Sequence, residues 1–231
     1  MIAIPDISSI AALIAEPARA SMLMALLDGR ALPASELAQQ AWVSPQTASS
    51  HLAKLMEGRL LVVERHGRHR YYRLATWEVG QLIESLLAFA PSPPQPRQMQ
   101  MSVDVKAMRL ARTCYDHLAG KVGVELAYSL IEKGIIKLSG VYYRVTRQGS
   151  KWFDEFGIDI KAAERKRRVF AKQCFDWSER RDHIAGALGA AILIHLFELG
   201  WIARVKGSRT VRITHIGQEM FYKVFNIELS N

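Results

Sequence analysis

Apolar residues recur every three or four positions along most of the first 90 residues, which is the spacing of helices that bury one face. This pattern predicts a helix that Asp6 caps, and a second helix that begins at Pro17 and ends at Gly29. It also predicts a helix after Thr76 with a wide apolar stripe. The stripe consists of Val79, Leu82, Ile83, Leu86 and Leu87. A neighbouring two-stranded hairpin cannot cover this much apolar surface, so part of it is expected to meet a second subunit.

A short helix with one polar face lies at the centre of this segment. Ser44 can accept a freed backbone N–H, Pro45 occupies the first helical position, and Gly58 ends the helix. A companion helix starts at Ser35, and residues 41–43 form the turn between the two. The inner face consists of Ala48, Leu52, Leu55 and Met56. The outer face consists of Gln46, Thr47, Ser50, Ala53 and Lys54. Such a face suits the major groove of DNA, where amide and hydroxyl groups bond to base edges.

A basic β-hairpin is predicted after this helix. Residues 60–65 and 70–74 favour strands, and residues 66–69 form the turn. Its cations Arg65, Arg68 and Arg70 would lie along the phosphates beside the groove, where contacts position a protein without reading sequence. His51 and His69 are further candidates for DNA contact, although the pattern does not require them. The predicted DNA-contacting residues are therefore Ser44, Gln46, Thr47, Ser49, Ser50, His51, Lys54, Arg65, Arg68, His69 and Arg70.

These motifs resemble those of the ArsR/SmtB-type winged-helix repressors of bacteria. The matching stretches are Glu16–Arg19, Ser35–Ala38, Ser44–Leu52 and Gly67–Arg68. The resemblance implies a homodimer on a palindromic operator, with an affinity that an effector changes. It also implies that the first and last helices of this domain build the dimer. Burial of the last helix within one chain, against residues after Gln98, is the alternative.

Metal-sensing relatives carry paired cysteines on the helix before the reading helix, or an Asp/His set on the helix after the hairpin. The corresponding residues 36–40 and 77–89 contain neither cysteine nor histidine. The resemblance therefore predicts that those metal sites are absent here, and that an effector acts through the rest of the chain.

Composition and charge place the chain among basic globular proteins. Its 231 residues are 49% hydrophobic and allow a large core in one or two domains. No signal segment or membrane span is apparent, so we expect a cytoplasmic protein whose two cysteines are reduced. The net charge of +9 fits an anionic partner. Residues 1–90 are neutral overall, with 8 cations and 8 acids, but residues 54–73 hold six cations and two acids.

A proline-rich stretch divides the chain. It predicts a winged helix-turn-helix domain over residues 1–90, a linker over 91–98 and a second domain over 99–231. The second domain contains an internal repeat, because Asp116–Gly120 recurs as Asp182–Gly186, each followed by an apolar helix, a hairpin and a further helix. The predicted fold class is α+β, mainly α, with two helix–β-hairpin–helix units paired in the second domain. A seam between such units is a common place for a ligand.

Each repeat is preceded by a cysteine, an aromatic residue and an aspartate. The candidate effector residues are Cys114, Asp116, His117, Cys174, Asp176, Asp182 and His183. Paired units would turn both thiols to one cleft, where they can sense a thiophilic metal or metalloid, an oxidant or an electrophile. The alternative, which residue statistics favour, is inert buried cysteines with Asp116 and Asp182 as helix caps. Each cysteine is solitary, without the ligand spacing of a zinc site, so no metal site is predicted.

Residues Lys161–Lys172 form a helix-compatible run of six cations and one acid. The run suits flanking DNA or an anionic effector, and equally a solvated surface.

The sequence predicts an effector-responsive, sequence-specific transcriptional regulator that is a repressor, with double-stranded DNA, a second copy and an unknown small effector as partners. No catalytic set and no cofactor motif is visible. Two rival functions stay open. One is a nucleoid protein that binds DNA without sequence preference, and the other is a cysteine-dependent enzyme that uses the winged helix as a scaffold.

Overall fold

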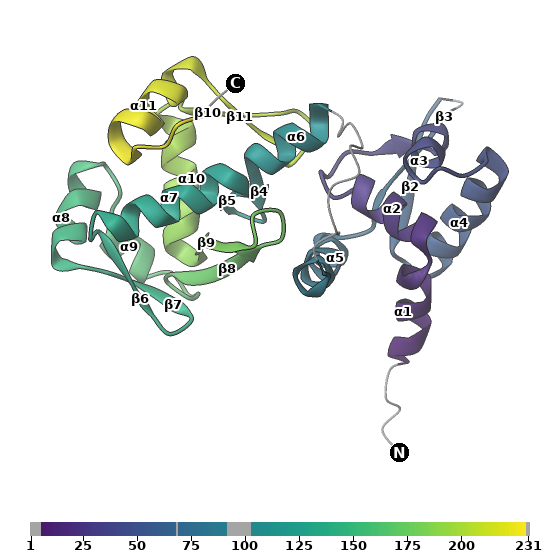
Figure 1. The fold of residues 1–231 in the computed structure, drawn as a ribbon, viewed down its shortest axis with the longest axis horizontal. Helices are drawn as coiled ribbons and strands as arrows, with labels where there is room; N and C mark the ends of the chain where they lie inside the picture. The colour runs from purple at the N-terminus through teal and green to yellow at the C-terminus, as the bar shows by residue number, and fades with distance from the viewer. Residues whose placement is uncertain (1–5, 68, 92–102, 230–231) are drawn as a thin grey trace. The chain divides into compact units, whose positions relative to one another are not determined.

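The structure is a computed structural model that describes residues 6–67, 69–91 and 103–229 of the chain. It divides into two compact units, Met1–Phe89 and Ala90–Asn231, whose helices and strands are labelled in Figure 1. The predicted linker lies, from residue 92 onward, outside the described residues. Among the described helices, none alone is long and apolar enough to span a membrane. The pair α1 (Ile7–Ala15) and α2 (Pro17–Ala25), bent by 86° at the break between them, passes that test of length and composition together.

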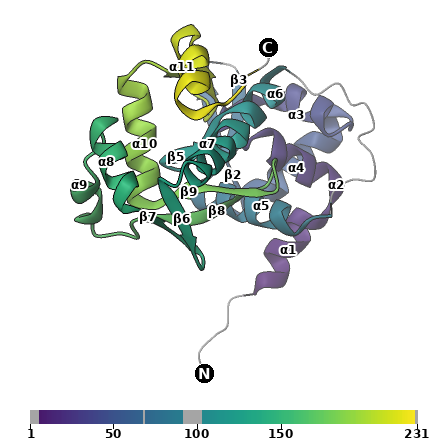
Figure 2. The same cartoon turned by 60° about the vertical axis from the view of Figure 1, so that its left-hand side comes forward.

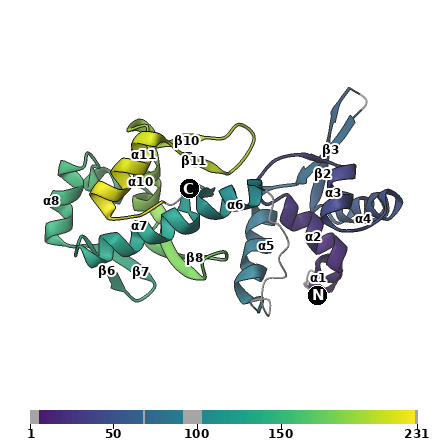
Figure 3. The ribbon, with the colours of Figure 1, turned by 45° about the horizontal axis from the view of Figure 1, so that its top comes forward.

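The amino-terminal unit is a winged helix-turn-helix. Its helices are α1 (Ile7–Ala15), α2 (Pro17–Ala25), α3 (Ala34–Gln40), α4 (Pro45–Glu57) and α5 (Trp77–Phe89). Its strands are β1 (Leu32–Pro33), β2 (Leu61–His66) and β3 (His69–Leu74), in the sheet order β1-β3-β2. Figure 3 shows β2 and β3 projecting as the wing.

Local signals fix most of these boundaries. Asp6 accepts a hydrogen bond from the backbone N–H of Ser8 at 2.9 Å, so the predicted cap of α1 is confirmed. The inner face of α4 is buried as predicted at Ala48, Leu52 and Leu55. Met56 is an exception, because 36% of its surface is exposed at the end of the helix. Each wing strand reaches one residue further into the turn than predicted, since His66 pairs with His69.

The carboxy-terminal unit contains helices and three small sheets. Its elements in chain order are α6 (Val103–Leu110), β4 (Arg112–Cys114), β5 (His117–Ala119), α7 (Gly120–Glu132), β6 (Ile136–Ser139), β7 (Tyr142–Val145), α8 (Arg147–Glu155), α9 (Ile160–Glu164), β8 (Lys172–Asp176), β9 (Arg181–Ala185), α10 (Gly186–Glu198), β10 (Ile202–Arg204), β11 (Val211–Ile213) and α11 (His215–Phe225). Strands β6 to β9 form one sheet in sequence order, visible in Figure 2, and β4-β5 and β10-β11 form two hairpins. Apolar side chains from α7, α10 and α11 share one core.

The order hairpin, helix, hairpin, helix occurs twice in this unit, over residues 112–155 and 172–225, which are called its first and second halves below. Helix α7 packs against β9 and helix α10 against β5, so each half contacts the hairpin of the other. Gly120 and Gly186 open the two helices with φ of +77° and +86°, a conformation that favours glycine. A Cβ on Gly120 would lie 2.6 Å from a backbone carbonyl oxygen of α6, and no side chain fits there.

Two sequence predictions about this unit are wrong. Helices α7 and α10 begin after Ala119 and Ala185, neither of which makes a side-chain cap, so Asp116 and Asp182 do not cap them. Both aspartates belong to hairpins, because the chain forms a strand where the capping rule assumed a loop before a helix. The basic run over residues 161–172 is not one helix either, since α9 ends at Glu164.

Candidate nucleic-acid interface and cysteine–histidine cluster

The polar face of α4 begins with a tight cap. Ser44 accepts a hydrogen bond from the backbone N–H of Thr47 at 3.1 Å, and the two hydroxyl oxygens lie 2.9 Å apart. The hydroxyl of Ser49 donates to the carbonyl oxygen of Pro45 at 2.9 Å. These bonds orient the hydroxyl groups. The predicted residues Ser44, Gln46, Thr47, Ser49, Ser50 and Lys54 are all exposed on this helix.

His51 has a different environment from the rest of the predicted set. Its Nε2 lies 3.7 Å from the carboxylate of Glu16, its Nδ1 lies 3.4 Å from Arg19, and only 15% of its side chain is exposed. Arg19 in turn donates to the carbonyl oxygens of Leu13 and Ala12 at the end of α1. The structure therefore gives His51 a role in tying α4 to α2.

The wing carries its cations in a cross-strand pair. Arg65 of β2 is directly opposite Arg70 of β3, and both are exposed, as is His69. Like charges that face each other across strands repel, unless an anion lies between or beside them. Arg68 lies outside the described residues. Arg73, further down the strand, pairs with Glu64 and serves the wing itself.

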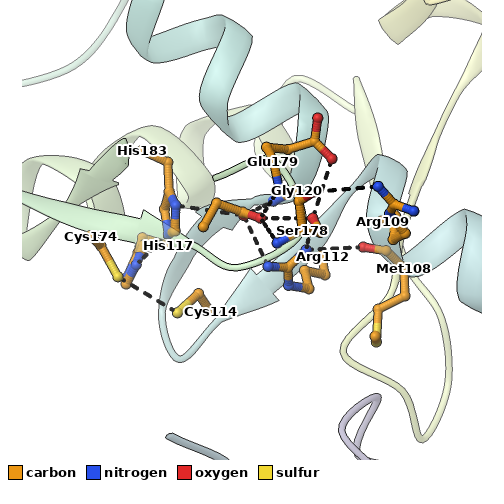
Figure 4. A network of polar contacts seen from close by, with 11 residues as sticks. Met108, Arg109, Arg112, Cys114, His117, Gly120, Cys174, Ser178, Glu179 and His183 are labelled. Atoms are coloured by element: carbon orange, nitrogen blue, oxygen red, sulfur yellow. Dashed lines mark hydrogen bonds and ion pairs between the residues drawn. The ribbon is translucent and has the colours of Figure 1, made fainter. Parts of the chain in front are cut away.

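Four of the seven effector candidates form one cluster, shown in Figure 4. Cys114, His117, Cys174 and His183 bring their ligand atoms within 4.8 Å of one another. The two sulfur atoms are 4.0 Å apart and the two Nε2 atoms are 3.1 Å apart. Both histidines and Cys114 are buried, whereas Cys174 is half-buried.

A carboxylate lies behind each histidine. Asp116 Oδ1 is 3.3 Å from Nδ1 of His117, and Asp176 Oδ2 is 3.7 Å from Nδ1 of His183. Asp116 also pairs with Arg168 of the basic run, so one cation of that run has a partner within the chain. Asp182 precedes His183 on β9, and successive side chains of a strand point to opposite faces, so it is not part of the cluster.

Asp176 is fully buried and connects the two hairpins. Its Oδ2 accepts hydrogen bonds from the backbone N–H of Gly120 at 2.7 Å and from Arg112 at 2.9 Å. Its Oδ1 accepts from the backbone N–H groups of Ser178 and Glu179 at 2.9 and 3.2 Å. Burial raises the pKa of this carboxyl group, but the charge of Arg112 and the hydrogen bonds from Ser178 and Gly120 outweigh burial and lower the pKa to about 2.

The other groups of the cluster also have shifted pKa values. The pKa of the Cys114 thiol rises to about 11, because it shares a hydrogen bond with Cys174 and because burial disfavours the thiolate. Burial lowers the pKa of His117, but its contacts with Asp116 and Cys114 outweigh burial and raise it. Burial raises the pKa of Asp116, but His117 and Arg168 outweigh it, and the net pKa is lowered.

Sequence reasoning singled out these cysteines and histidines but missed two features. It did not identify Arg112, because the neighbouring residues in the sequence do not reveal that this side chain is buried against Asp176. It also treated each cysteine as solitary, although Cys114 and His117 are three residues apart and pair across β4 and β5. Cys174 and His183 pair in the same way across β8 and β9. A hairpin turn between the members of each pair was the signal that could have linked them.

Comparisons with known proteins identify the class. Residues 14–64, which include α2 to α4 and most of β2, match a family described as a helix-turn-helix domain. The fold and the exposed face of α4 thus define a DNA-binding transcriptional regulator. A Bacillus subtilis (strain 168) protein described as the uncharacterized HTH-type transcriptional regulator YdfF is 47% identical over 225 residues, covering 97% of this chain and 99% of that protein. The chain belongs to the family of HTH-type transcriptional regulators.

Two similar solved structures each cover little more than a third of this chain. The homodimeric winged helix-turn-helix domain of a possible ArsR-family regulator from Mycobacterium bovis covers 38% of this chain and 89% of that chain, with 24% identity and a TM-score of 0.34. The match to the transcriptional repressor BigR from Xylella fastidiosa covers 38% of this chain and 88% of the BigR chain, with 23% identity and a TM-score of 0.35.

Proposed function

We propose that this regulator is a repressor that binds a palindromic operator as a homodimer and responds to an effector through its carboxy-terminal unit. The observation that carries the proposal is the exposed outer face of α4, where Gln46 and Ser50 present amide and hydroxyl groups. Such groups recognise base edges in the major groove. The exposed pair Arg65 and Arg70 supplies phosphate contacts beside it, which fix the register of the helix.

Competition between specific and random DNA tests this function. We expect the protein to bind the DNA upstream of its own gene, because repressors often control adjacent genes. Unlabelled random duplex should displace the labelled fragment only at concentrations roughly 1,000-fold or more above those of unlabelled upstream duplex. The measurement is a fluorescence-anisotropy titration at fixed salt. Equal displacement by both competitors, across upstream fragments that tile the region, would instead indicate a nucleoid protein.

Two helices of the amino-terminal unit support the homodimer. No residue of helix α1 is fully buried, and Ile7 is 82% exposed. Helix α5 leaves Leu86 and Phe89 exposed at 45% and 88%. Exposed apolar surface on the first and last helices of a domain is typical of an interface between subunits.

Introducing a charge into this surface should separate the subunits. We expect Leu86→Glu to give the mass of one chain in sedimentation equilibrium, whereas the wild type gives the mass of two, because a buried unpaired carboxylate opposes association. The matched control is Gln81→Glu, an exposed polar position on the same helix. A dimer that persists in Leu86→Glu would place the interface elsewhere.

The carboxy-terminal unit supports a duplicated effector domain. Thr146 accepts from the backbone N–H of Gly149, and Thr214 accepts from that of Gly217, both at 2.9 Å, at the start of the last helix of each half. A Cβ on either glycine would lie 1.9 Å from a backbone carbonyl oxygen, that of Ile135 for Gly149 and that of Trp201 for Gly217. The same helix cap and the same close contact at equivalent positions are expected when one unit has been duplicated.

The environment of the thiols supports a regulator over a cysteine-dependent enzyme. A catalytic cysteine needs a lowered pKa and an accessible thiolate. Cys114 is buried and its pKa is raised to about 11. The cluster therefore suits ligand binding better than nucleophilic attack.

A further inference from the structure

Two hairpins from different halves of the carboxy-terminal unit each place a cysteine directly opposite a histidine. Cys114 faces His117 across β4 and β5, and Cys174 faces His183 across β8 and β9. Residues directly opposite each other in an antiparallel pair have their side chains on the same face. Figure 4 shows the two pairs turned toward each other, which gives two sulfur and two nitrogen ligands around one point.

The spacing of these atoms fits a tetrahedral metal centre. With bonds of about 2.3 Å to sulfur and 2.0–2.1 Å to nitrogen, a tetrahedral ion separates two sulfur ligands by about 3.8 Å and two nitrogen ligands by about 3.3 Å. The structure has 4.0 Å between the sulfur atoms of Cys114 and Cys174, and 3.1 Å between the Nε2 atoms of His117 and His183. These two separations are each within a few tenths of an ångström of the tetrahedral values, and all four ligand atoms lie within 4.8 Å of one another.

A carboxylate lies behind each histidine ring. Asp116 Oδ1 is 3.3 Å from Nδ1 of His117, and Asp176 Oδ2 is 3.7 Å from Nδ1 of His183. The Asp116 carboxylate is within hydrogen-bond distance of His117 and favours the tautomer with the proton on Nδ1, which is the usual arrangement behind a metal-bound histidine, whereas Nδ1 of His183 lies beyond that distance from Asp176. The two Nε2 atoms lie 3.1 Å apart, so both rings present a ligand atom to the same point.

The charge of the cluster favours a divalent ion. Two thiolates and a divalent cation sum to zero, and both histidines bind as neutral imidazoles. Neutrality matters because His183 and Cys114 are only 1% and 8% exposed, and a net charge at such a place is costly. The nearby cations are already balanced, since Arg112 pairs with Asp176 and Arg168 with Asp116.

A disulfide is the competing use of the two thiols. Their separation of 4.0 Å would need to shorten to about 2.0 Å. A disulfide, however, needs neither the two facing imidazoles nor the carboxylate behind each of them. A metal ion would use all four of these side chains, whereas a disulfide would use only two.

We propose that Cys114, His117, Cys174 and His183 form a tetrahedral S2N2 site for a divalent ion of the zinc class, which joins the two halves of the carboxy-terminal unit. The site stands independently of DNA binding. Its test therefore uses no DNA, and failure of the metal site would leave the proposed operator binding untouched.

Titration of the reduced, metal-free full chain with Co2+ tests the site. We expect one equivalent per chain to saturate the intense visible absorption of tetrahedral cobalt together with a thiolate-to-cobalt charge-transfer band. Zn2+ should abolish both signals by displacement, and should raise the midpoint of thermal unfolding, because an ion that binds only the folded state stabilises it. A weak octahedral spectrum would overturn the proposal. So would the absence of cobalt binding by the fully reduced protein, if the same protein readily forms a Cys114–Cys174 disulfide on oxidation.

Substitutions assign the spectrum to these residues. Cys174→Ser should remove the charge-transfer intensity of one thiolate and lower the affinity for Co2+ at least 100-fold. Asp116→Ala should lower that affinity roughly tenfold to 100-fold, because Asp116 orients the ring of His117. His215→Ala is the matched control, because His215 is exposed and lies outside the cluster. Far-ultraviolet circular dichroism checks that each variant is folded. A folded Cys174→Ser variant with the wild-type cobalt spectrum would also overturn the proposal.

Discussion

Replacing Asp176 by alanine should destabilise the carboxy-terminal unit by about 3–5 kcal/mol, the usual cost of removing one partner of a buried ion pair. The side chains of Arg112 and Asp176 are 1% and 0% exposed. Without the carboxylate, the guanidinium keeps its charge in the interior while it loses its ion-pair partner. The N–H groups of Gly120 and Ser178 would lose their acceptor as well.

Denaturation in guanidinium chloride, with a chelator present, measures this effect without any contribution from a bound metal. Asp176→Asn should lie between the wild type and the alanine variant, because the amide oxygen still accepts but carries no charge. Asp154→Ala, at an exposed position of α8, serves as the control and should change the free energy of unfolding by less than about 0.5 kcal/mol. A loss below about 1 kcal/mol in Asp176→Ala would show that the ion pair does not hold the two hairpins together.

The winged helix was predictable because its signals are local. Ser44, Pro45 and Gly58 bound a helix that the structure places at Pro45–Glu57, and its three buried apolar residues follow from helical spacing alone. Met56 failed the same reasoning because it lies in the last turn, where the neighbouring surface no longer covers it. Which element covers an amphipathic face is decided by tertiary structure and not by the pattern.

The carboxy-terminal cluster was predictable only in part. The repeated cysteines indicated that two equivalent positions would approach each other, and their sulfur atoms, 60 residues apart in sequence, do so. The prediction that Asp116 and Asp182 cap helices was wrong, because the capping rule considers only the residues that follow in the sequence and not contacts with distant residues. Asp116 instead pairs with Arg168, 52 residues away, and no local pattern contains that contact.

The same limit applies to the metal ligands. Zinc motifs are recognised in sequence when two ligands stand close together on each side of a turn. Cys114 and His117 meet that description, but Cys174 and His183 are separated by a longer turn, and the two pairs meet only through the packing of one half on the other.

Gln46→Ala and Arg70→Ala should separate the reading of bases from the holding of phosphates. Gln46 lies in the first turn of α4, the part of a recognition helix that reaches base edges, and it is exposed. Its loss should cost about 1–3 kcal/mol on the operator, or roughly fivefold to 150-fold in affinity, and nothing on random duplex. Arg70 is proposed to contact phosphate. Its loss should therefore lower the affinity for all duplexes alike, and should lower the slope of log affinity against log salt concentration by about 1.

Parallel titrations of operator and random duplex over a range of salt concentrations test this division most directly. The controls are Gln148→Ala and Arg147→Ala, which remove an exposed amide and an exposed cation from α8 of the carboxy-terminal unit. If α4 reads bases and the wing holds phosphates, Gln46→Ala loses affinity only for the operator, Arg70→Ala loses affinity for both duplexes, and the controls match the wild type. Equal losses on both duplexes for Gln46→Ala and Arg70→Ala would contradict recognition by α4.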